Sequence, residues 1–248
     1  MPSGLDGDPN PISTPERSRV LAEVARTVLS RRRAGTPLLV AVDGVDGSGK
    51  STFADELADH LARHDGDLTV VRASIDSFHH PRRRRWARGR SSPVGFYLDS
   101  HDLDALRRLL LDPLADGREA VYRIEAFDEP TDRAVDGAEI HVGGHEVLLF
   151  DGLFLCRPEL IGYWDVVIFL DAGERVSLDR LGAVLAEAPP GGEPLVDHVL
   201  QWVRRLDRYV SGMRYYLDAE NPAAKADLVI DNNDLANPMI TTHRPPHR

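Results

Sequence analysis

Residues 44–52 of the chain are GVDGSGKST, which matches the phosphate-binding pattern G-x-x-x-x-G-K-[ST] without a mismatch. A continuous apolar run (PLLVAV, 37–42) precedes this stretch, and a helix is predicted from Lys50 to about Arg63. Glycine backbones can wrap closely around a phosphate, and the amides at the start of a helix attract anions. The stretch therefore predicts a buried strand, a phosphate loop and a helix in succession, as in a parallel α/β fold.

The residue types in this loop have expected tasks. Lys50 would place its charge at the β- and γ-phosphates, and the Ser51 hydroxyl would ligate Mg²⁺. The motif predicts a bound nucleoside triphosphate, and it does not distinguish a kinase from a GTPase or an ATP-driven switch. The residues expected to bind the nucleotide are Gly44, Asp46, Gly47, Ser48, Gly49, Lys50, Ser51 and Thr52.

Apolar runs alternate with amphipathic segments along the rest of the chain. Such alternation predicts a three-layer α/β fold with a mostly parallel central sheet, helices on both faces and a small hairpin-like excursion. Strands are predicted at 68–75, 146–150, 166–170 and 226–230, with two short strands of the excursion at 120–127 and 138–142. Helices are predicted at 15–33 with Thr14 as the cap, from His101 or Asp102 to Leu114, at 175–188 and at 195–217.

The two ends of the chain differ in composition from its centre. Residues 1–13 are rich in Pro, Gly, Ser and Asp and are expected to be disordered. The polar residues 235–248 are expected to form a loose tail. One domain is predicted between these ends, over residues 14–234, with a lid at about 175–205.

The composition narrows the classes of protein that the chain can represent. Its 248 residues carry 30 Lys and Arg against 40 Asp and Glu, a net charge of −10. Nucleic acid is therefore an unlikely partner, and the single cysteine, Cys156, cannot form a disulfide within the chain. No apolar run approaches the ~18 residues of a membrane span, and the N-terminus lacks the features of a secretory signal. We expect a cytoplasmic protein without membrane contact, and the sequence leaves a homo-oligomer open.

Two acidic residues follow predicted strands and are candidates for the chemistry. Asp151 ends the run VLLF and is expected, with Ser51, to hold Mg²⁺; an ordinary Asp-Gly turn is the alternative. Asp76 follows the second strand and is expected to accept a proton from an attacking hydroxyl; a capping role is the alternative. Guanine is not the expected base, because residues 231–234 are the only stretch similar to Asn-Lys-x-Asp and contain no lysine.

Taken together, the motifs resemble those of the uridine kinase/phosphoribulokinase branch of P-loop kinases, and within it the actinobacterial uridine kinase-like proteins. The resemblance covers roughly residues 36–232 in the family's order. It implies a P-loop NTPase fold, a P-loop kinase domain, and transfer of the γ-phosphate of Mg-ATP to a small-molecule acceptor, for which a nucleoside is expected. The matching segments are GVDGSGKST (44–52), DSFHH (76–80), GFYLDSHDLDAL (95–106), FDEPTDR (127–133), LLFDG (148–152), WDVVIFLD (164–171), RYVSGMRYYL (208–217) and ADLVIDN (226–232).

The resemblance also implies roles for residues outside the phosphate loop. Asp76 takes the place of the general base at the sugar 5′-hydroxyl, and Asp99 falls near a ribose-binding Asp, with Asp102 as its competitor. Phe127 and Asp128 fall at a pair that helps to form the base pocket. The substrate-binding residues implied in this way are Asp76, Phe78, His79, Asp99, Phe127, Asp128 and Arg133.

Two departures from the family pattern bear on the acceptor and on the rate. The pyrimidine-reading His that follows the base-pocket pair is absent, and Thr131 and Asp132 stand there instead. Of the lid arginines only Arg180 remains, so Arg204 and Arg205 on the next predicted helix are expected to supply the missing catalytic charge. A kinase for pantothenate or a sugar phosphate, and a catalytically weak ATP-binding regulator, are therefore kept as alternatives.

An arginine cluster at residues 82–90 holds six arginines, and without them the chain has 24 cationic against 40 anionic residues. Three interpretations stay open: recognition of an anionic acceptor with stacking on Trp86, contact with nucleic acid, or a solvated loop paired with acidic neighbours. The preceding His79 and His80 are not expected to hold one metal together, because adjacent side chains diverge.

Overall fold

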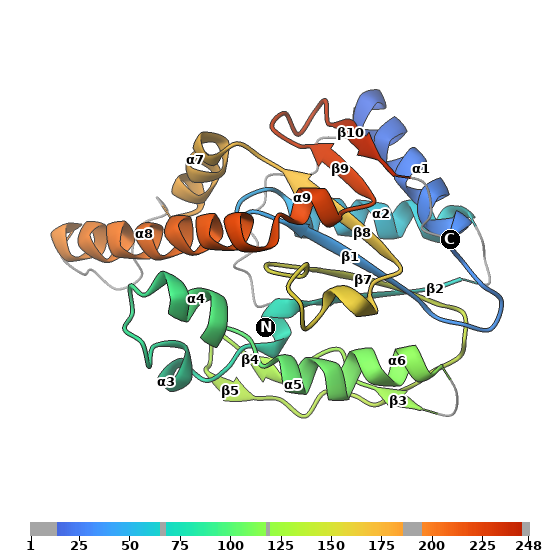
Figure 1. Ribbon diagram of the computed structural model, residues 1–248, viewed down its shortest axis with the longest axis horizontal. Coiled ribbons are helices and arrows are strands. Elements are labelled where there is room, and N and C mark those ends of the chain that lie inside the picture. The colour runs from blue at the N-terminus through green and yellow to red at the C-terminus, as the bar shows by residue number, and fades with distance from the viewer. Residues whose placement is uncertain (1–13, 65–67, 118–119, 186–194, 245–248) are drawn as a thin grey trace.

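The computed structural model describes residues 14–64, 68–117, 120–185 and 195–244; for residues 183–185 and 195–206 it describes the helical backbone and not the side chains. Its central feature is a six-stranded sheet with the strand order β10-β9-β8-β1-β7-β2 (Figure 1). All strand pairs are parallel except that of β10 with β9. The strands are β1 (Leu38–Gly44), β2 (Thr69–Ser74), β7 (Glu146–Gly152), β8 (Val166–Asp171), β9 (Leu228–Asp231) and β10 (Met239–His243).

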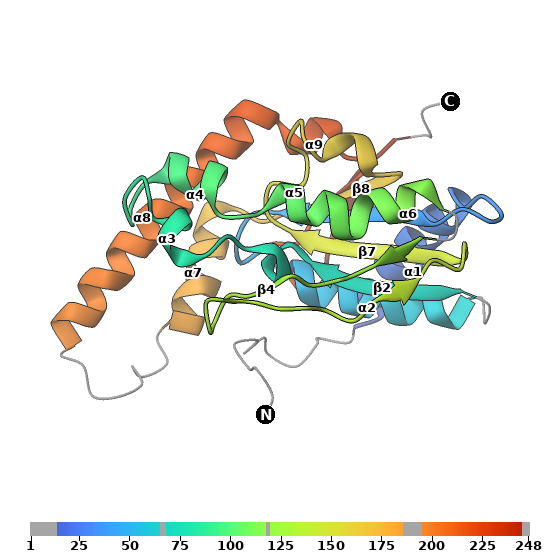
Figure 2. The same ribbon diagram turned by 90° about the horizontal axis from the view of Figure 1, so that it is seen from below.

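The sheet separates two hydrophobic clusters. In β1, which is buried along its whole length, Leu39 and Ala41 belong to one cluster and Val40 and Val42 to the other. This alternation follows from the two-residue period of a strand. Helices α1 (Pro15–Ser30) and α2 (Lys50–His64) cover one face, and α5 (Leu103–Leu106) and α6 (Asp112–Asp116) cover the other (Figure 2). The predicted three-layer α/β fold is confirmed.

Short helices follow β2, in a stretch whose residues show no helical period. They are η1 (Ile75–Phe78), α3 (Arg82–Arg85) and α4 (Pro93–Asp99). The helix predicted to end at Leu114 is continuous but contains a π-helical turn, η2 (Arg107–Leu111), between α5 and α6. The Asp102 carboxylate caps α5 by accepting a hydrogen bond from the Ala105 amide at 2.9 Å.

The predicted hairpin-like excursion is present and contains two short ladders. Strand β3 (Val121–Tyr122) pairs with β6 (Ile140–His141), and β4 (Phe127–Asp128) pairs with β5 (Arg133–Ala134), both antiparallel. The Ala126 amide donates to the Ser77 carbonyl at 2.9 Å. The excursion is thereby attached to η1, at the end of β2.

The helices of the predicted lid region are α7 (Glu174–Leu185) and α8 (Leu195–Glu220). The residues between them lie outside the described part of the chain. The C-terminal half of α8 packs on α4, where the helices approach closely: a Cβ added at Gly212 would lie 2.6 Å from the Phe96 ring. The short helices η3 (Ile161–Tyr163) and α9 (Pro222–Lys225) complete the described elements.

The C-terminal segment differs from the loose tail expected over 235–248. Residues 239–243 form β10 at the edge of the sheet, so the ordered domain extends beyond residue 234. The polar pattern MITTH hid this strand, because an edge strand buries only one face. The segment before it is also attached, since Arg17 donates to the Leu235 carbonyl at 3.0 Å. The N-terminal residues 1–13 lie outside the described residues.

A pair of neighbouring variants tests whether β10 contributes to the fold. Ile240 is half-buried against the α1–α2 side of the core, whereas Met239 is 58% exposed. Ile240→Ala should lower the free energy of unfolding by about 1–2 kcal/mol, below the range for a fully buried site. Met239→Ala should change it by less than about 0.5 kcal/mol. Equal effects of the two variants in urea titrations would contradict the packing of β10.

Candidate active site

The phosphate loop joins β1 to α2, as predicted. Gly47 and Gly49 have φ angles of 73° and 83°, in the left-handed region that favours glycine. A Cβ at Gly47 would also lie 2.8 Å from the Ser177 carbonyl oxygen of α7. The Ser48 hydroxyl is buried without a hydrogen-bond partner among the described residues. A close backbone turn with an unpaired polar group fits the binding of a phosphate.

Lys50, the cation of the loop, bends back over it. Its Nζ donates to the Val45 carbonyl oxygen at 2.8 Å. The ammonium group therefore lies within the loop that would hold the phosphates, and one hydrogen bond to a carbonyl holds it there.

Ser51 and Asp151 meet at the carboxyl edge of the sheet. Asp151 is opposite Val42 of β1 in the strand register, so β7 ends level with the start of the phosphate loop. The Ser51 hydroxyl donates to Asp151 Oδ2 at 2.7 Å. A hydroxyl and a carboxylate are oxygen ligands of the kind that Mg²⁺ prefers, so this pair fits the predicted metal site.

Arg72 is a member of this site that the sequence did not reveal. From the middle of β2 its guanidinium donates to Asp151 Oδ1 at 3.0 Å and to the Leu149 carbonyl at 2.7 Å. It also pairs with Asp55 of α2 at 2.8 Å. These contacts fix the orientation of the Asp151 carboxylate. The sequence signals this role only by an arginine within an edge strand. The partners of Arg72 come from other elements, so their contact with it has no local pattern.

Asp76 lies in η1, two residues beyond Ser74, which is opposite Asp151 in the register of β2 and β7. Its amide donates to the Ser74 hydroxyl, so the short helix is capped by Ser74 rather than by Asp76. The Asp76 side chain is 74% exposed at the sheet edge. Protein atoms around the carboxyl, beyond its immediate contacts, exclude water and so raise the pKa of Asp76. His79 lowers this pKa, and the Asp151 carboxylate raises it further.

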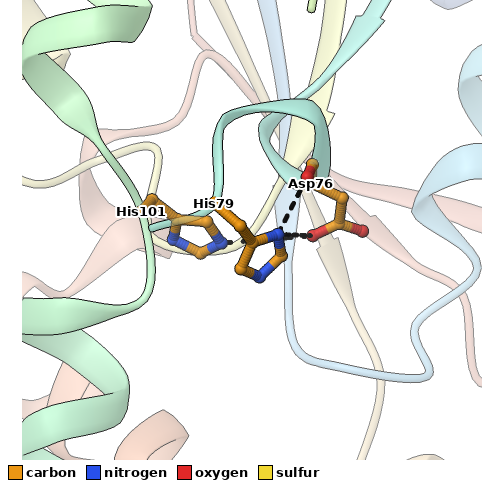
Figure 3. A group of neighbouring side chains, drawn as sticks. All are labelled: Asp76, His79 and His101. Carbon is orange, nitrogen blue, oxygen red and sulfur yellow. Dashed lines mark hydrogen bonds and ion pairs between the residues drawn. The ribbon is translucent and has the colours of Figure 1, made fainter. Parts of the chain in front are cut away.

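Two histidines flank Asp76 (Figure 3). His79 Nδ1 lies 2.8 Å from the Asp76 carbonyl oxygen and 3.9 Å from its Oδ1, and His101 Nε2 lies 4.0 Å from the same Oδ1. Burial holds the pKa of His101 well below its ordinary value, so its ring is neutral. His80 turns away to Asp102, at 3.5 Å, which agrees with the prediction that His79 and His80 diverge. The sequence could not indicate His101, since it comes from a different segment.

The residues expected at the acceptor are only partly exposed. Phe78 is fully buried with its ring 6.4 Å from that of Phe150, so it belongs to the core and cannot contact a substrate there. Phe127 is buried as well, at 7% exposure. Asp128 accepts a hydrogen bond from the Thr131 hydroxyl at 2.6 Å and is opposite Arg133 in the β4–β5 ladder.

Asp99, the other residue expected at the acceptor, ends α4. Its carboxylate accepts a hydrogen bond from Arg88 Nε at 2.8 Å. Its competitor Asp102 is engaged as the cap of α5. An acceptor bound by Asp99 would therefore have to share it with an arginine of the cluster.

Arg180 of α7 lies over the phosphate loop. Its guanidinium donates to the Gly47 carbonyl at 3.1 Å and to the carbonyls of Asn232 and Asn233, both at 2.9 Å. Arg180, the arginine expected in the lid, thus lies beside the phosphate loop, where backbone carbonyl oxygens hold its guanidinium group. The side chains of Arg204 and Arg205 lie outside the described residues.

Two arginines of the cluster, Arg85 and Arg88, form ion pairs with acidic residues of other segments. Arg85 is buried and contacts Glu129 at 2.5 Å and Asp132 at 3.4 Å, which attaches α3 to the tip of the excursion. Trp86 has the guanidinium groups of Arg82 and Arg90 at 5.3 and 4.1 Å from its ring. Two arginines of the cluster therefore stack on Trp86, a residue of the same segment.

A buried polar network supports the loop from below. Asp43, the residue before Gly44, is fully buried; it accepts hydrogen bonds from the Tyr216 hydroxyl of α8 and, at 2.8 Å, from the Gly44 amide. The Tyr216 hydroxyl accepts from the Cys156 amide at 3.0 Å. Burial raises the pKa of Asp43 and of the Cys156 thiol, so Cys156 is an inert buried residue.

Comparisons with known proteins find similarity to several kinases. A pantothenate kinase from Clavibacter michiganensis subsp. michiganensis is 32% identical over 154 residues, which are 58% of this chain and 46% of that protein. A uridine kinase from Lactobacillus helveticus is 22% identical over 214 residues, 83% of this chain and 93% of that protein. The structure of a possible uridine kinase from Bacillus stearothermophilus matches with a TM-score of 0.63 at 22% identity, over 86% of this chain and 98% of that chain. No protein-family model matches.

The chain shares with these solved kinase structures an α/β fold with a mostly parallel central sheet and helices on both faces. It spans about half the length of the pantothenate kinase that it matches. Among the described residues, none of the helices combines the length and apolar character needed to cross a bilayer.

Two neighbouring tyrosines test the support of the loop. Tyr216→Phe removes the buried hydroxyl and leaves the Asp43 carboxylate and the Cys156 amide short of a partner, so the free energy of unfolding should fall by about 1–3 kcal/mol. Tyr215→Phe changes a side chain that is 44% exposed and should cost less than about 0.5 kcal/mol. Thermal and urea unfolding measure the stability of both variants. A Tyr216→Phe protein with the wild-type free energy of unfolding would contradict the network.

Proposed function

We propose that the protein is an ATP-dependent phosphotransferase that moves the γ-phosphate of Mg-ATP to a hydroxyl of a small metabolite. The proposal rests on the 2.7 Å contact between the Ser51 hydroxyl and the Asp151 carboxylate, which brings the phosphate loop and the end of β7 together. Asp76 lies at the same sheet edge and is accessible to solvent. A triphosphate loop, oxygen ligands for Mg²⁺ and an accessible carboxylate are the parts that phosphoryl transfer requires.

The residues divide the proposed reaction between them. Lys50 exchanges its hydrogen bond to Val45 for the β- and γ-phosphate oxygens. Mg²⁺ held by Ser51 and Asp151 would neutralise phosphate charge. Asp76 accepts the acceptor's proton while the acceptor oxygen bonds to the γ-phosphorus and the bond from phosphorus to ADP breaks. Arg180, beside Gly47, stabilises the charge of the transferring group.

A nucleoside is the acceptor that we propose first. The support is a uridine kinase relative that aligns over 83% of this chain, together with the excursion beside η1 that would form the acceptor's pocket. Phe127 and Asp128 stand at the base-pocket pair of the family that the chain resembles, and Phe127 is buried. The acceptor would therefore contact Asp128 and the polar edge of the hairpin more than an aromatic face.

Pantothenate is the second candidate acceptor. A pantothenate kinase is 32% identical over 154 residues, a higher identity than that of the uridine kinase relative over a shorter part of the chain. The missing pyrimidine-reading His favours this candidate, since Thr131 and Asp132 occupy the corresponding place.

An acceptor panel tests the activity and the choice of acceptor together. The full chain with Mg-ATP should form ADP and a phosphorylated product with one of uridine, cytidine, pantothenate or a sugar phosphate. Lys50→Ala is the control, because it removes the cation at the phosphates. No product above that control with any acceptor, while ATP binds tightly in calorimetry, would contradict the enzyme and favour an ATP-binding regulator.

The role of Asp76 is tested with an isosteric change. Asp76→Asn keeps the size of the side chain and removes the base, so kcat should fall by about 10²–10⁴-fold, while ATP affinity stays within a few-fold. Asp104→Asn, at a carboxylate on α5 that is 88% exposed, is the matched control and should keep wild-type kcat. Retention of kcat by Asp76→Asn within threefold would contradict its role as the base.

A further inference from the structure

Asp76, His79 and His101 converge from two segments (Figure 3). One possible ligand atom of each lies within 4.8 Å of the others, and this is the group of three metal-ligating side chains that the described residues offer. His79 Nδ1 and His101 Nε2 lie 3.9 and 4.0 Å from the same oxygen, Asp76 Oδ1. The three side chains thus surround one point.

The backbone holds the two histidines in place. The His80 amide donates to the Ser100 carbonyl at 2.9 Å, and the Asp102 amide donates to the Phe78 carbonyl at 2.7 Å. These bonds join the segments before and after each histidine as an isolated antiparallel bridge between His79 and His101. Their ring centroids are 4.5 Å apart. The pair is therefore arranged before anything binds.

His101 lacks the hydrogen bonds that a buried imidazole usually makes. Its side chain is 1% exposed, and Nδ1 has no partner among the described residues. Nε2 faces Asp76 Oδ1 at 4.0 Å, which is too long for a hydrogen bond. A buried polar ring without partners is costly unless a further group completes it. A cation between Nε2 and the Asp76 carboxylate would give Nε2 and Oδ1 a partner, whereas Nδ1 would stay unpaired.

We propose that Asp76, His79 and His101 form a binding site for a divalent transition metal ion of the zinc class, separate from the Mg²⁺ pair Ser51 and Asp151. Two imidazole nitrogens and one carboxylate oxygen suit Zn²⁺, whereas Mg²⁺ prefers oxygen ligands throughout. Three protein ligands with a fourth position open to solvent is an arrangement that zinc accepts. The exposed side of Asp76 provides that opening.

The geometry predicts reversible binding. Zinc–ligand bonds of about 2.0–2.1 Å put the ligand atoms about 3.3 Å apart in a tetrahedron, so the three side chains must each move inward by about half an ångström. His79 also gives up the 2.8 Å contact of its Nδ1 with the Asp76 carbonyl. The His101 Nδ1 atom has no outer partner of the kind that orients most zinc-bound imidazoles.

The consequence for catalysis rests on the proposed function. A metal ion on Oδ1 of Asp76 removes the base that would accept the acceptor's proton. The bound ion therefore inhibits phosphoryl transfer, and excess Mg²⁺ does not relieve the inhibition because it binds elsewhere.

Calorimetric titration of ZnCl₂ into the full chain tests the site without nucleotide or acceptor, in a large excess of Mg²⁺. One equivalent of Zn²⁺ should bind. His79→Asn and His101→Asn should each weaken binding by more than about 100-fold, the upper range for loss of an outer partner. The matched control is His80→Asn, which alters the adjacent histidine that faces Asp102 and should leave the affinity within threefold.

The proposal would be overturned if no Zn²⁺ binds, if neither His79→Asn nor His101→Asn weakens binding, or if His80→Asn weakens it equally. His79 is more exposed than His101, so His79→Asn keeps the test decisive if His101→Asn does not fold. In the acceptor assay, one equivalent of Zn²⁺ should lower the wild-type rate at least tenfold and that of His79→Asn less than twofold. A chain that never transfers phosphate would contradict the proposed function and leave the zinc titration standing.

Discussion

The parallel register of β1, β7 and β2 is the constraint on which the site depends. Val42 and Ser74 both lie opposite Asp151, so the three strands end level at one edge of the sheet. Each strand then delivers a different group just beyond that level: the glycine loop, the Asp151 carboxylate and Asp76. Backbone hydrogen bonds between the strands thus bring side chains that are far apart in the sequence to the same edge of the sheet, beside the phosphate loop. A slip of one residue would turn each of these side chains to the opposite face.

Charge at this edge is balanced by contacts that come from outside the motif. Arg72 takes one oxygen of Asp151 while Ser51 takes the other, so the carboxylate is oriented by two groups at once. Asp43 brings a buried acid directly below the loop, and the Tyr216 hydroxyl of α8 is its partner. This contact joins the long helix of the lid region to the strand that carries the loop. The network therefore couples the fold of the C-terminal half to the position of the phosphate loop.

The parts that the sequence predicted are those with a local signal. The glycine loop and the apolar runs of β1, β7 and β8 are encoded within a few consecutive residues, and the strands lie within about two residues of their predicted bounds. The edge strand β10 was missed because only alternate residues of such a strand pack on the core. The turns η1, α3 and α4 are too short to show a helical period.

The partners in the site could not be predicted, for a different reason. Arg72, Tyr216 and His101 each meet these partners from a distant segment of the chain, so no spacing in the sequence encodes those contacts. Phe78 shows the opposite error, since a residue inside a matching motif is placed in the core. The motif predicted where the site lies, and three-dimensional packing determines which of its side chains are accessible.

We propose that Ser51 and Asp151 together hold one Mg²⁺ ion for the triphosphate. The most direct test measures ATP affinity with and without Mg²⁺ in the wild type, Ser51→Ala, Asp151→Asn and the double variant. If the two residues hold one ion, either change should remove most of the gain from Mg²⁺, and the double variant should lose little more than the worse single one, a coupling of about 0.5–3 kcal/mol. Independent, additive losses, or a gain from Mg²⁺ that survives both changes, would contradict the account.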